Sequence, residues 1–266
     1  MYLGTSLHER NVHNLKIAVV SDVISEKGYF PIWHSYYASA VGEENIFLFS
    51  YRNKIHNSIV LNLSYSDGMR LKIITYQVEK LLEIYDVVVR VDADEFLIPM
   101  NGTLKDYLEN LEKDYVTARG FNVFQSDDQP LDLKLPILKQ RNLMYATAFM
   151  NKTCITKTPL KWSKGFHFCN KPPAFDDLCL IHLKYADDVM EQEWQSRMIS
   201  NASERGIIKH YSTKHEFRGY PIEENIQRDA FNQLFMSKVS QNEGMYSSIL
   251  HSEKINLVIP EKLKIF

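Results

Sequence analysis

The feature that most constrains the fold is a run of β-branched residues that ends on two carboxylates. The run consists of Val87, Val88, Val89 and Val91, and it is followed by Asp92 and Asp94. Short continuous apolar runs of this kind are typical of strands that are buried on both faces, as in parallel sheets. Open α/β sheets bind ligands where such strands leave the sheet. The sequence therefore predicts a buried strand with a divalent-cation site at its end.

Strand-like and helix-like segments alternate before this run. The pattern predicts, in order, a strand at 16–21, a helix at 28–41, a strand at 45–51 and a helix at 67–83. After the valine run we expect a helix at 103–111, capped by Asn101 or Thr103, and then a strand at 115–124. Alternation of strands and helices is typical of βαβ units with right-handed crossovers. We therefore expect an α/β fold with a Rossmann-like, mostly parallel sheet flanked by helices.

The second half of the chain has a different pattern. After a polar loop at 127–136, strand-like segments are expected at 144–149, 152–157, 164–168 and 178–184, and helices at 186–206 and 223–240. Few helices separate these strands, so this part of the sheet is expected to be mixed or antiparallel.

Charge and cysteine content exclude several classes of protein. A net charge of −2 over 266 residues argues against a nucleic-acid binder. The three cysteines form no CxxC pair, and no stretch matches a signal peptide or a membrane span. We expect a cytoplasmic protein. A peripheral contact of the C-terminal tail with a membrane surface is an alternative to a short strand there.

The spacing of the two aspartates decides how they can act together. In a continuing strand Asp92 and Asp94 point to the same face, because side chains alternate, and both can reach one ion. Mg²⁺ and Mn²⁺ prefer oxygen ligands and bind through one or two carboxylates plus substrate phosphates. The same alternation places Glu95 on the opposite face. The structural alternative is that the aspartates form a turn or cap a helix.

The segment from Asp92 to Phe96 reads DADEF and resembles the DxD signature of GT-A glycosyltransferases, more narrowly of the family-2-like and family-92-like group. Three other stretches are similar to that group. They are residues 33–49 (a first helix and second strand), 161–167 (KWSKGFH) and 180–185 (LIHLKY). Together they cover about two-thirds of the chain in the order found in the family.

The resemblance implies a set of metal ligands. Asp94 and His182 would ligate Mn²⁺ or Mg²⁺, and Asp92 would contact the ribose or reach the metal through water. Imidazole suits Mn²⁺, which accepts mixed nitrogen and oxygen ligands. For His182 the structural alternative is a hydrogen-bonded histidine in a buried strand.

Donor-binding residues are expected at the ends of the first two strands and on the helix before the DxD strand. The candidates are Ser21, Asp22, Glu26, Tyr51, Arg52, Arg70 and Gln77, together with Asp92. The strings after these strands depart from the family's usual Asn-Glu and Asp-Asn, which leaves the base of the nucleotide open.

An inverting transfer also needs a carboxylate that deprotonates the acceptor hydroxyl. Loop candidates are Asp176 and Asp177, with Asp127 and Asp128 as alternatives. His167 is expected in a strand, on the face opposite Phe166 and Phe168, where it could relay a proton or contact phosphate or acceptor; its alternative is an exposed histidine.

These observations predict a metal-dependent glycosyltransferase that moves a sugar from a nucleotide-sugar donor to the hydroxyl of a glycan or lipid-linked acceptor, in surface polysaccharide or glycoconjugate synthesis. The expected organisation is a single GT-A-like domain, 1–266, with a nucleotide-sugar-binding half (1–125), an acceptor and metal-completing half (126–222), and a C-terminal helix and tail (223–266). The alternatives are a non-catalytic sugar-nucleotide-binding or scaffold subunit and a phosphatase or phosphotransferase that uses the DxD as nucleophile.

Overall fold

The computed structural model describes residues 15–24, 27–146, 150–201, 222–223, 238–242, 244–249 and 256–264. In chain order the elements are β1 (Ile17–Val23), α1 (Phe30–Val41), η1 (Glu43–Asn45), β2 (Ile46–Tyr51), β3 (Ile59–Leu61), α2 (Asp67–Leu81), β4 (Val87–Arg90), β5 (Glu95–Pro99), α3 (Leu104–Glu109), β6 (Tyr115–Phe124), α4 (Ile137–Gln140), β7 (Leu143–Ala146), β8 (Lys152–Thr156), η3 (Lys164–Phe166), β9 (Phe175–Tyr185), α5 (Asp188–Asn201), β10 (Ile222–Glu223), β11 (Lys238–Asn242), β12 (Met245–Ile249), β13 (Asn256–Val258) and η4 (Glu261–Leu263).

A parallel block of four strands forms one side of the main sheet. β1 pairs in parallel with β2 and with β4, and β2 pairs in parallel with β3. All residues of β1 and β4 are buried, which is why both segments are continuously apolar apart from their ends. The strands predicted at 16–21 and 45–51 and within the valine run are confirmed.

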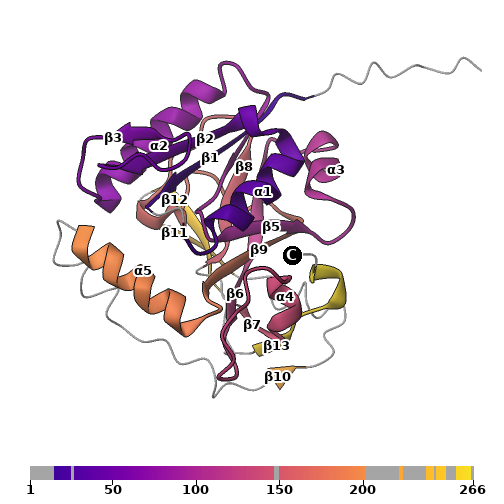
Figure 1. Cartoon of the computed structure of the whole chain (residues 1–266). Helices are drawn as coiled ribbons and strands as arrows, with labels where there is room; N and C mark the ends of the chain where they lie inside the picture. The colour runs from indigo at the N-terminus through magenta and orange to yellow at the C-terminus, as the bar shows by residue number, and fades with distance from the viewer. Residues whose placement is uncertain are drawn as a thin grey trace, which may run out of the picture.

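Helices cover both faces of this block (Figure 1). Trp33 and Tyr37 of α1 pack with Val19 and Val89 on one face. On the other face, Ile74 and Val78 of α2 belong to a second core cluster, which contains Val20 and Val88. Successive residues of a strand point to opposite faces, so β1 and β4 contribute to both cores at once.

The second half of the chain extends the same sheet in mixed orientation. β8 lies antiparallel to β4, and β6 lies antiparallel to β8 and β7. β9 runs parallel to β6 and antiparallel to β5, with Glu95 opposite His182. The described chain is therefore a mixed α/β arrangement with helices flanking a central sheet, compatible with a Rossmann-like fold. Within its described residues, no helix has both the length and the apolarity to cross a bilayer.

The helices α2 and α3 begin at side-chain caps. The Ser66 hydroxyl accepts a hydrogen bond from the Met69 amide at the start of α2. Thr103 and Asp106 form a capping box at the start of α3, so Thr103 rather than Asn101 is the cap. Each cap satisfies amide groups that the first turn of a helix leaves without partners.

Three predicted elements are corrected by the structure. Residues 164–168 form a turn instead of a strand, because Gly165 and Phe166 have left-handed backbone angles. The expected helix at 223–240 is wrong at both ends, which lie in β10 and β11, and its middle falls outside the described residues. The tail forms a strand at β13, and the helix expected at 186–206 is described only to Asn201, as α5.

Close approach of backbone to backbone occurs where β6 passes Met150. A Cβ atom on Gly120 would lie 2.2 Å from the carbonyl carbon of Met150. The Gly120 amide donates to the Asn151 side-chain oxygen at 2.8 Å, which holds the two segments together. No side chain fits at this position without displacing main chain.

We predict that Gly120→Ala lowers the free energy of unfolding by about 1–3 kcal/mol, the range for forced overpacking. Gly68→Ala is the matched control, because the nearest atom to its added Cβ is Lys164 Cε at 3.9 Å. It should instead stabilise α2, by about 0.4–1 kcal/mol. Denaturant unfolding of both variants measures the difference, and equal effects would contradict this account of Gly120.

Candidate active site at the carboxyl edge of the parallel strands

The chain turns sharply after β4, and this turn sets the directions of the carboxylates. The Glu95 amide donates to the Asp92 carbonyl at 3.0 Å, and the Leu183 amide of β9 donates to the Asp94 carbonyl at 3.0 Å. Residues 92–94 therefore leave the strand, as expected for carboxylates at a strand end, so the alternation that would point Asp92 and Asp94 to one face does not apply. Asp92 and Asp94 consequently have separate partners.

The Asp92 carboxylate contacts three cationic side chains. Its Oδ1 accepts hydrogen bonds from Arg70 of α2 and from Arg90 of β4, and its Oδ2 accepts one from Lys152 of β8 at 2.9 Å. Burial by itself would raise the pKa of the Asp92 carboxyl, but these cations hold that pKa well below its usual range. Asp92 is therefore an anion around which three elements are assembled.

Glu95 is a second carboxylate that contacts Lys152. Its Oε1 accepts a hydrogen bond from Lys152, and its Oε2 accepts one from the Asp92 amide at 3.1 Å. The prediction that Glu95 points away from Asp92 is wrong, because the turn brings both side chains to the same ammonium group. Burial would lower the pKa of Lys152, and the two carboxylates outweigh that effect and raise it.

The network extends to the first two strands of the sheet. Arg70 Nε donates to Asp22 at 2.8 Å, and the Tyr51 hydroxyl donates to the same carboxylate at 3.2 Å. Arg70 thus bridges Asp22, near the end of β1, and Asp92, just after β4. Three of the predicted donor-site side chains, Asp22, Tyr51 and Arg70, are brought to Asp92.

Asp94 faces a histidine instead of a cation cluster. Its Oδ2 lies 3.4 Å from His182 Nε2, and the His182 Nδ1 lies 2.7 Å from the Asn122 side-chain oxygen. An amide oxygen only accepts hydrogen bonds, so Nδ1 carries a proton and Nε2 is the ring atom that faces Asp94. Two acceptors in this position require a proton or a metal ion between them.

Both side chains of this pair remain accessible. The Asp94 side chain is 20% exposed and that of His182 is 12% exposed, which is enough for an ion to reach them from solvent. Burial alone would raise the pKa of the Asp94 carboxyl, yet the His182 imidazole keeps it below its ordinary value. Asp94 is thus ionised and oriented, as a metal ligand must be.

A strained turn supports the cation cluster from the side. Phe166, with a φ of 61°, places its ring 3.4 Å from the Arg90 guanidinium carbon and 5.1 Å from that of Arg70. Gly165 precedes it with a φ of 73°, and an added Cβ there would meet the His167 ring at 2.8 Å. Left-handed angles in successive residues are costly and are typical of functional sites.

His167 follows this turn and belongs to the same site. Burial, together with Lys152 and Arg90, lowers the pKa of His167 to about 3, so the ring is neutral at physiological pH. Its Nδ1 is buried and has no hydrogen-bond partner in the structure. The strand predicted for His167 is wrong, but its side chain stays within electrostatic reach of Asp92 and His182.

The donor set fits a divalent cation at Asp94 and His182. Around Arg70 the three carboxylates of Asp22, Asp92 and Glu95 balance the cations of Arg70, Arg90 and Lys152. Asp94 adds a further negative charge, which a proton or cation at His182 would balance. Asp92 does not join the pair as a third ligand, because its oxygens face the cations instead.

Other predicted donor residues lie away from this network or outside the described residues. Ser21 is buried, and its hydroxyl donates to the Asp22 carbonyl. Arg52 is exposed and donates to Ser64. Gln77 lies two turns beyond Arg70 along α2, or about 10 Å. Glu26 falls outside the described residues.

The structure does not bring Asp176 and Asp177 to the site. They stand at the start of β9, five or six residues before His182, which is roughly 17–20 Å along an extended strand. Asp176 instead accepts a hydrogen bond from Tyr107 at 3.2 Å. A general base must lie within hydrogen-bond reach of the proton that it removes, so the prediction that they serve as base is corrected.

Two groups near Asp94 were not predicted from the sequence. Burial raises the pKa of the Glu191 carboxyl of α5, and His182 and Lys184 act on it in the opposite direction. The Tyr29 hydroxyl is buried without a hydrogen-bond partner and feels the charges of Asp94 and Glu191. A carboxylate on a predicted amphipathic helix gives no local signal of this placement.

Comparison with known proteins adds little to this geometry. No known protein family and no curated protein matches the chain. The chain is similar to part of a solved structure, a cytidylyltransferase from Leptospira borgpetersenii serovar Hardjo-bovis (strain JB197), at 10% sequence identity and a TM-score of 0.23. The alignment covers 44% of this chain and 56% of that protein. The functional conclusion therefore depends on the site itself.

We predict that the two aspartates differ sharply in their effect on stability. Asp92→Asn leaves three buried cations without their common anion and should lower the free energy of unfolding by about 3–5 kcal/mol. Asp94→Asn leaves the ion pairs of Arg70, Arg90 and Lys152 with Asp92 in place, so its effect should stay within about 1 kcal/mol. Chemical unfolding of both variants measures this. A similar loss for both would contradict the division of roles.

Proposed function

We propose that the protein is a metal-dependent glycosyltransferase of the GT-A kind. It transfers a sugar from a nucleotide-sugar donor to a hydroxyl of a glycan or lipid-linked acceptor. The observation that carries the proposal is the facing pair of acceptors, Asp94 and His182, at the carboxyl edge of the parallel strands. Such an edge is where open α/β sheets bind ligands, and the pair requires a cation or a proton between its members.

The ligand chemistry supports Mn²⁺ or Mg²⁺ as the cation. One carboxylate and one imidazole leave most coordination positions to water and to the phosphates of a donor, which is how these ions usually bind. When bound, the ion would stabilise the negative charge that develops on the leaving diphosphate. Asn122 fixes the imidazole by its contact with Nδ1, as partners behind metal-binding histidines commonly do.

The cations beside the pair have a separate role in this proposal. Arg70 and Lys152 are held at the edge by Asp22, Asp92 and Glu95. Their positions are therefore fixed before a diphosphate arrives, which is the arrangement that makes charge stabilisation effective. Neutral His167, with its unpartnered Nδ1, offers a hydrogen bond near the same group.

Glu191 is the candidate base for the acceptor hydroxyl. Glu191 and Asp94 both act electrostatically on Tyr29 and Lys184, and His182 acts on Glu191 itself. Its raised pKa makes it a better proton acceptor than an ordinary carboxylate. Asp127 and Asp128, on the loop after β6, are alternatives at the same end of β9 as His182.

The phosphatase alternative is less well supported. A nucleophilic aspartate needs an oxygen that is free to attack, whereas both oxygens of Asp92 accept hydrogen bonds from cations. The non-catalytic alternative predicts nucleotide binding without turnover of a donor, which the experiment below separates from transfer.

The first test measures binding and turnover together. UDP-, GDP-, CMP- and dTDP-linked sugars, each with and without Mn²⁺, are screened for a rise in melting temperature and for release of the nucleotide. We expect one nucleotide class to bind only with Mn²⁺. Asp94→Asn and His182→Gln should each lower turnover about 100-fold or more.

Asp114→Asn, an exposed aspartate before β6, is the matched control and should turn over donor like the wild type. The transferase proposal would be refuted if no nucleotide sugar raised the melting temperature and if Asp94→Asn melted like the wild type under every condition. Mn²⁺-dependent binding without turnover would support the non-catalytic alternative.

The role of Glu191 gives a prediction about pH. A base acts when it is deprotonated, and burial raises the pKa of this carboxyl above its ordinary 4.5. The transfer rate should therefore fall as the pH drops through that raised pKa, while donor binding persists. Glu191→Gln should lower the rate about 10²–10⁴-fold and abolish this acid limb. An unchanged pH profile in Glu191→Gln would exclude Glu191 as the base.

A further inference from the structure

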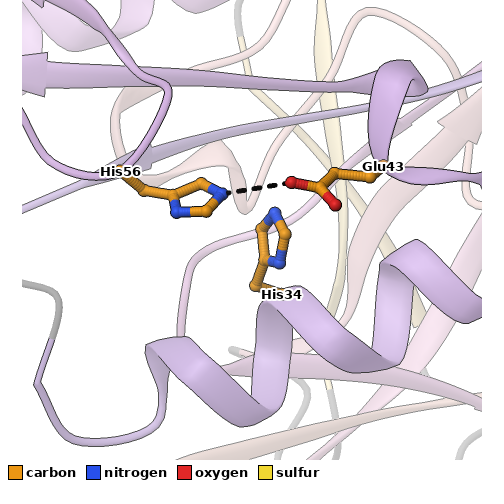
Figure 2. Close-up of side chains that lie close together, drawn as sticks. All are labelled: His34, Glu43 and His56. Carbon is orange, nitrogen blue, oxygen red and sulfur yellow. Dashed lines mark ion pairs between the residues drawn. The ribbon is translucent and has the colours of Figure 1, made fainter.

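A second group of side chains with metal-ligating atoms is formed by residues outside the candidate active site. His34 of α1, Glu43 of η1 and His56 of the β2–β3 loop converge, as Figure 2 shows. One possible ligand atom from each lies within 4.8 Å of the other two. Within the described parts of the chain this is the only such group of three histidine, cysteine or acidic side chains.

The contacts in this triad are those of ligands around a common point. His56 Nε2 lies 3.5 Å from a Glu43 carboxylate oxygen. The rings of His34 and His56 stand edge to face with their centroids 4.4 Å apart. Figure 2 shows the His34 ring directed between the other two side chains. A carboxylate and two imidazole rings gathered this closely can share one cation.

The protein backbone holds each ligand in place. Around His56 the Ser58 amide donates to the Ile55 carbonyl at 3.0 Å, and the Ser58 hydroxyl lies 2.7 Å from that of buried Ser50. His56 itself has a left-handed φ of 50°, an unusual angle for a residue with a side chain. Gly42, with a φ of 88°, ends α1 and starts the turn that carries Glu43.

Aromatic packing orients the two imidazole rings of the triad. Phe30 packs against both rings, with centroid distances of 5.8 Å to His34 and 6.1 Å to His56. Packing of this kind limits the rotation of the rings and keeps them oriented.

We propose that His34, Glu43 and His56 form a site for a first-row transition metal ion, with Zn²⁺ as the best match. Two imidazoles and a carboxylate are a ligand set that binds Zn²⁺ and leaves the fourth position to water. Mg²⁺ and Ca²⁺ prefer oxygen ligands, so the second imidazole favours Zn²⁺ here over the Mn²⁺ or Mg²⁺ proposed at Asp94. The ion fastens the β2–β3 loop to α1, directly beyond Tyr51.

Co²⁺ is the probe for a direct test, because its visible absorption reports the geometry and ligands of a Zn²⁺ site. The full chain, without a histidine tag and stripped with a chelator, is titrated with Co²⁺ and then with competing Zn²⁺. We expect a saturable visible band that Zn²⁺ displaces, and a rise in melting temperature with Zn²⁺.

The variants assign the band to the triad. His56→Asn keeps a residue that tolerates left-handed angles but removes the imidazole. Glu43→Gln alters an exposed side chain and so leaves folding intact. Loss of a residue that only orients a metal ligand lowers metal affinity about 10- to 100-fold. Loss of a ligand itself should weaken Co²⁺ and Zn²⁺ binding by at least that factor.

Two controls should keep the site. Glu44→Gln changes the adjacent carboxylate, which lies beside Gly42 and outside the triad. Asp94→Asn removes a ligand of the other candidate cation site. It therefore tests whether metal binding by the triad is independent of the proposed transferase activity. Wild-type affinity in His56→Asn and Glu43→Gln, or no Co²⁺ band in the wild type, would overturn the proposal.

Discussion

The carboxylate of Asp92 is the point on which the rest of the site depends. It accepts hydrogen bonds from Arg70 of α2, Arg90 of β4 and Lys152 of β8, which are a helix and two neighbouring strands. A charge buried with several partners is costly to leave uncompensated, so the elements that supply them must dock together. The two aspartates of the DxD segment thus have different roles. Asp92 holds together the elements at the sheet edge, and Asp94 remains accessible to a ligand.

Much of the fold could be predicted because local pattern and tertiary environment agree. The valine run before Arg90 is apolar on both faces because α1 and α2 cover both, and β6 spans the predicted residues 115–124. Disagreement arises where single residues override the pattern. Gly165 and Phe166 adopt left-handed angles within an apolar, strand-like stretch, and the ring of Phe166 supports Arg90.

The candidate site was predictable in part for a related reason. Asp22 and Tyr51 lie near the ends of β1 and β2, and Arg70 lies on the helix that packs on β1, so topology alone brings them together. Lys152 has no such signal. It is the first residue of β8, which pairs antiparallel with β4 although the two strands are far apart in the sequence. Asp176 and Asp177 lie on the same strand as His182 but at its far end, a distance that their nearness in sequence conceals.

The position of β4 between β1 and β8 bears on how the chain is made. During synthesis β1, β2 and β4 can pair as soon as they emerge, but the other edge of β4 stays open until β8 follows. A valine-rich edge without its neighbour is prone to pair with other chains. Between the emergence of residues 90 and 156 this edge of β4 has no partner strand within the chain, so a nascent chain is exposed to aggregation there.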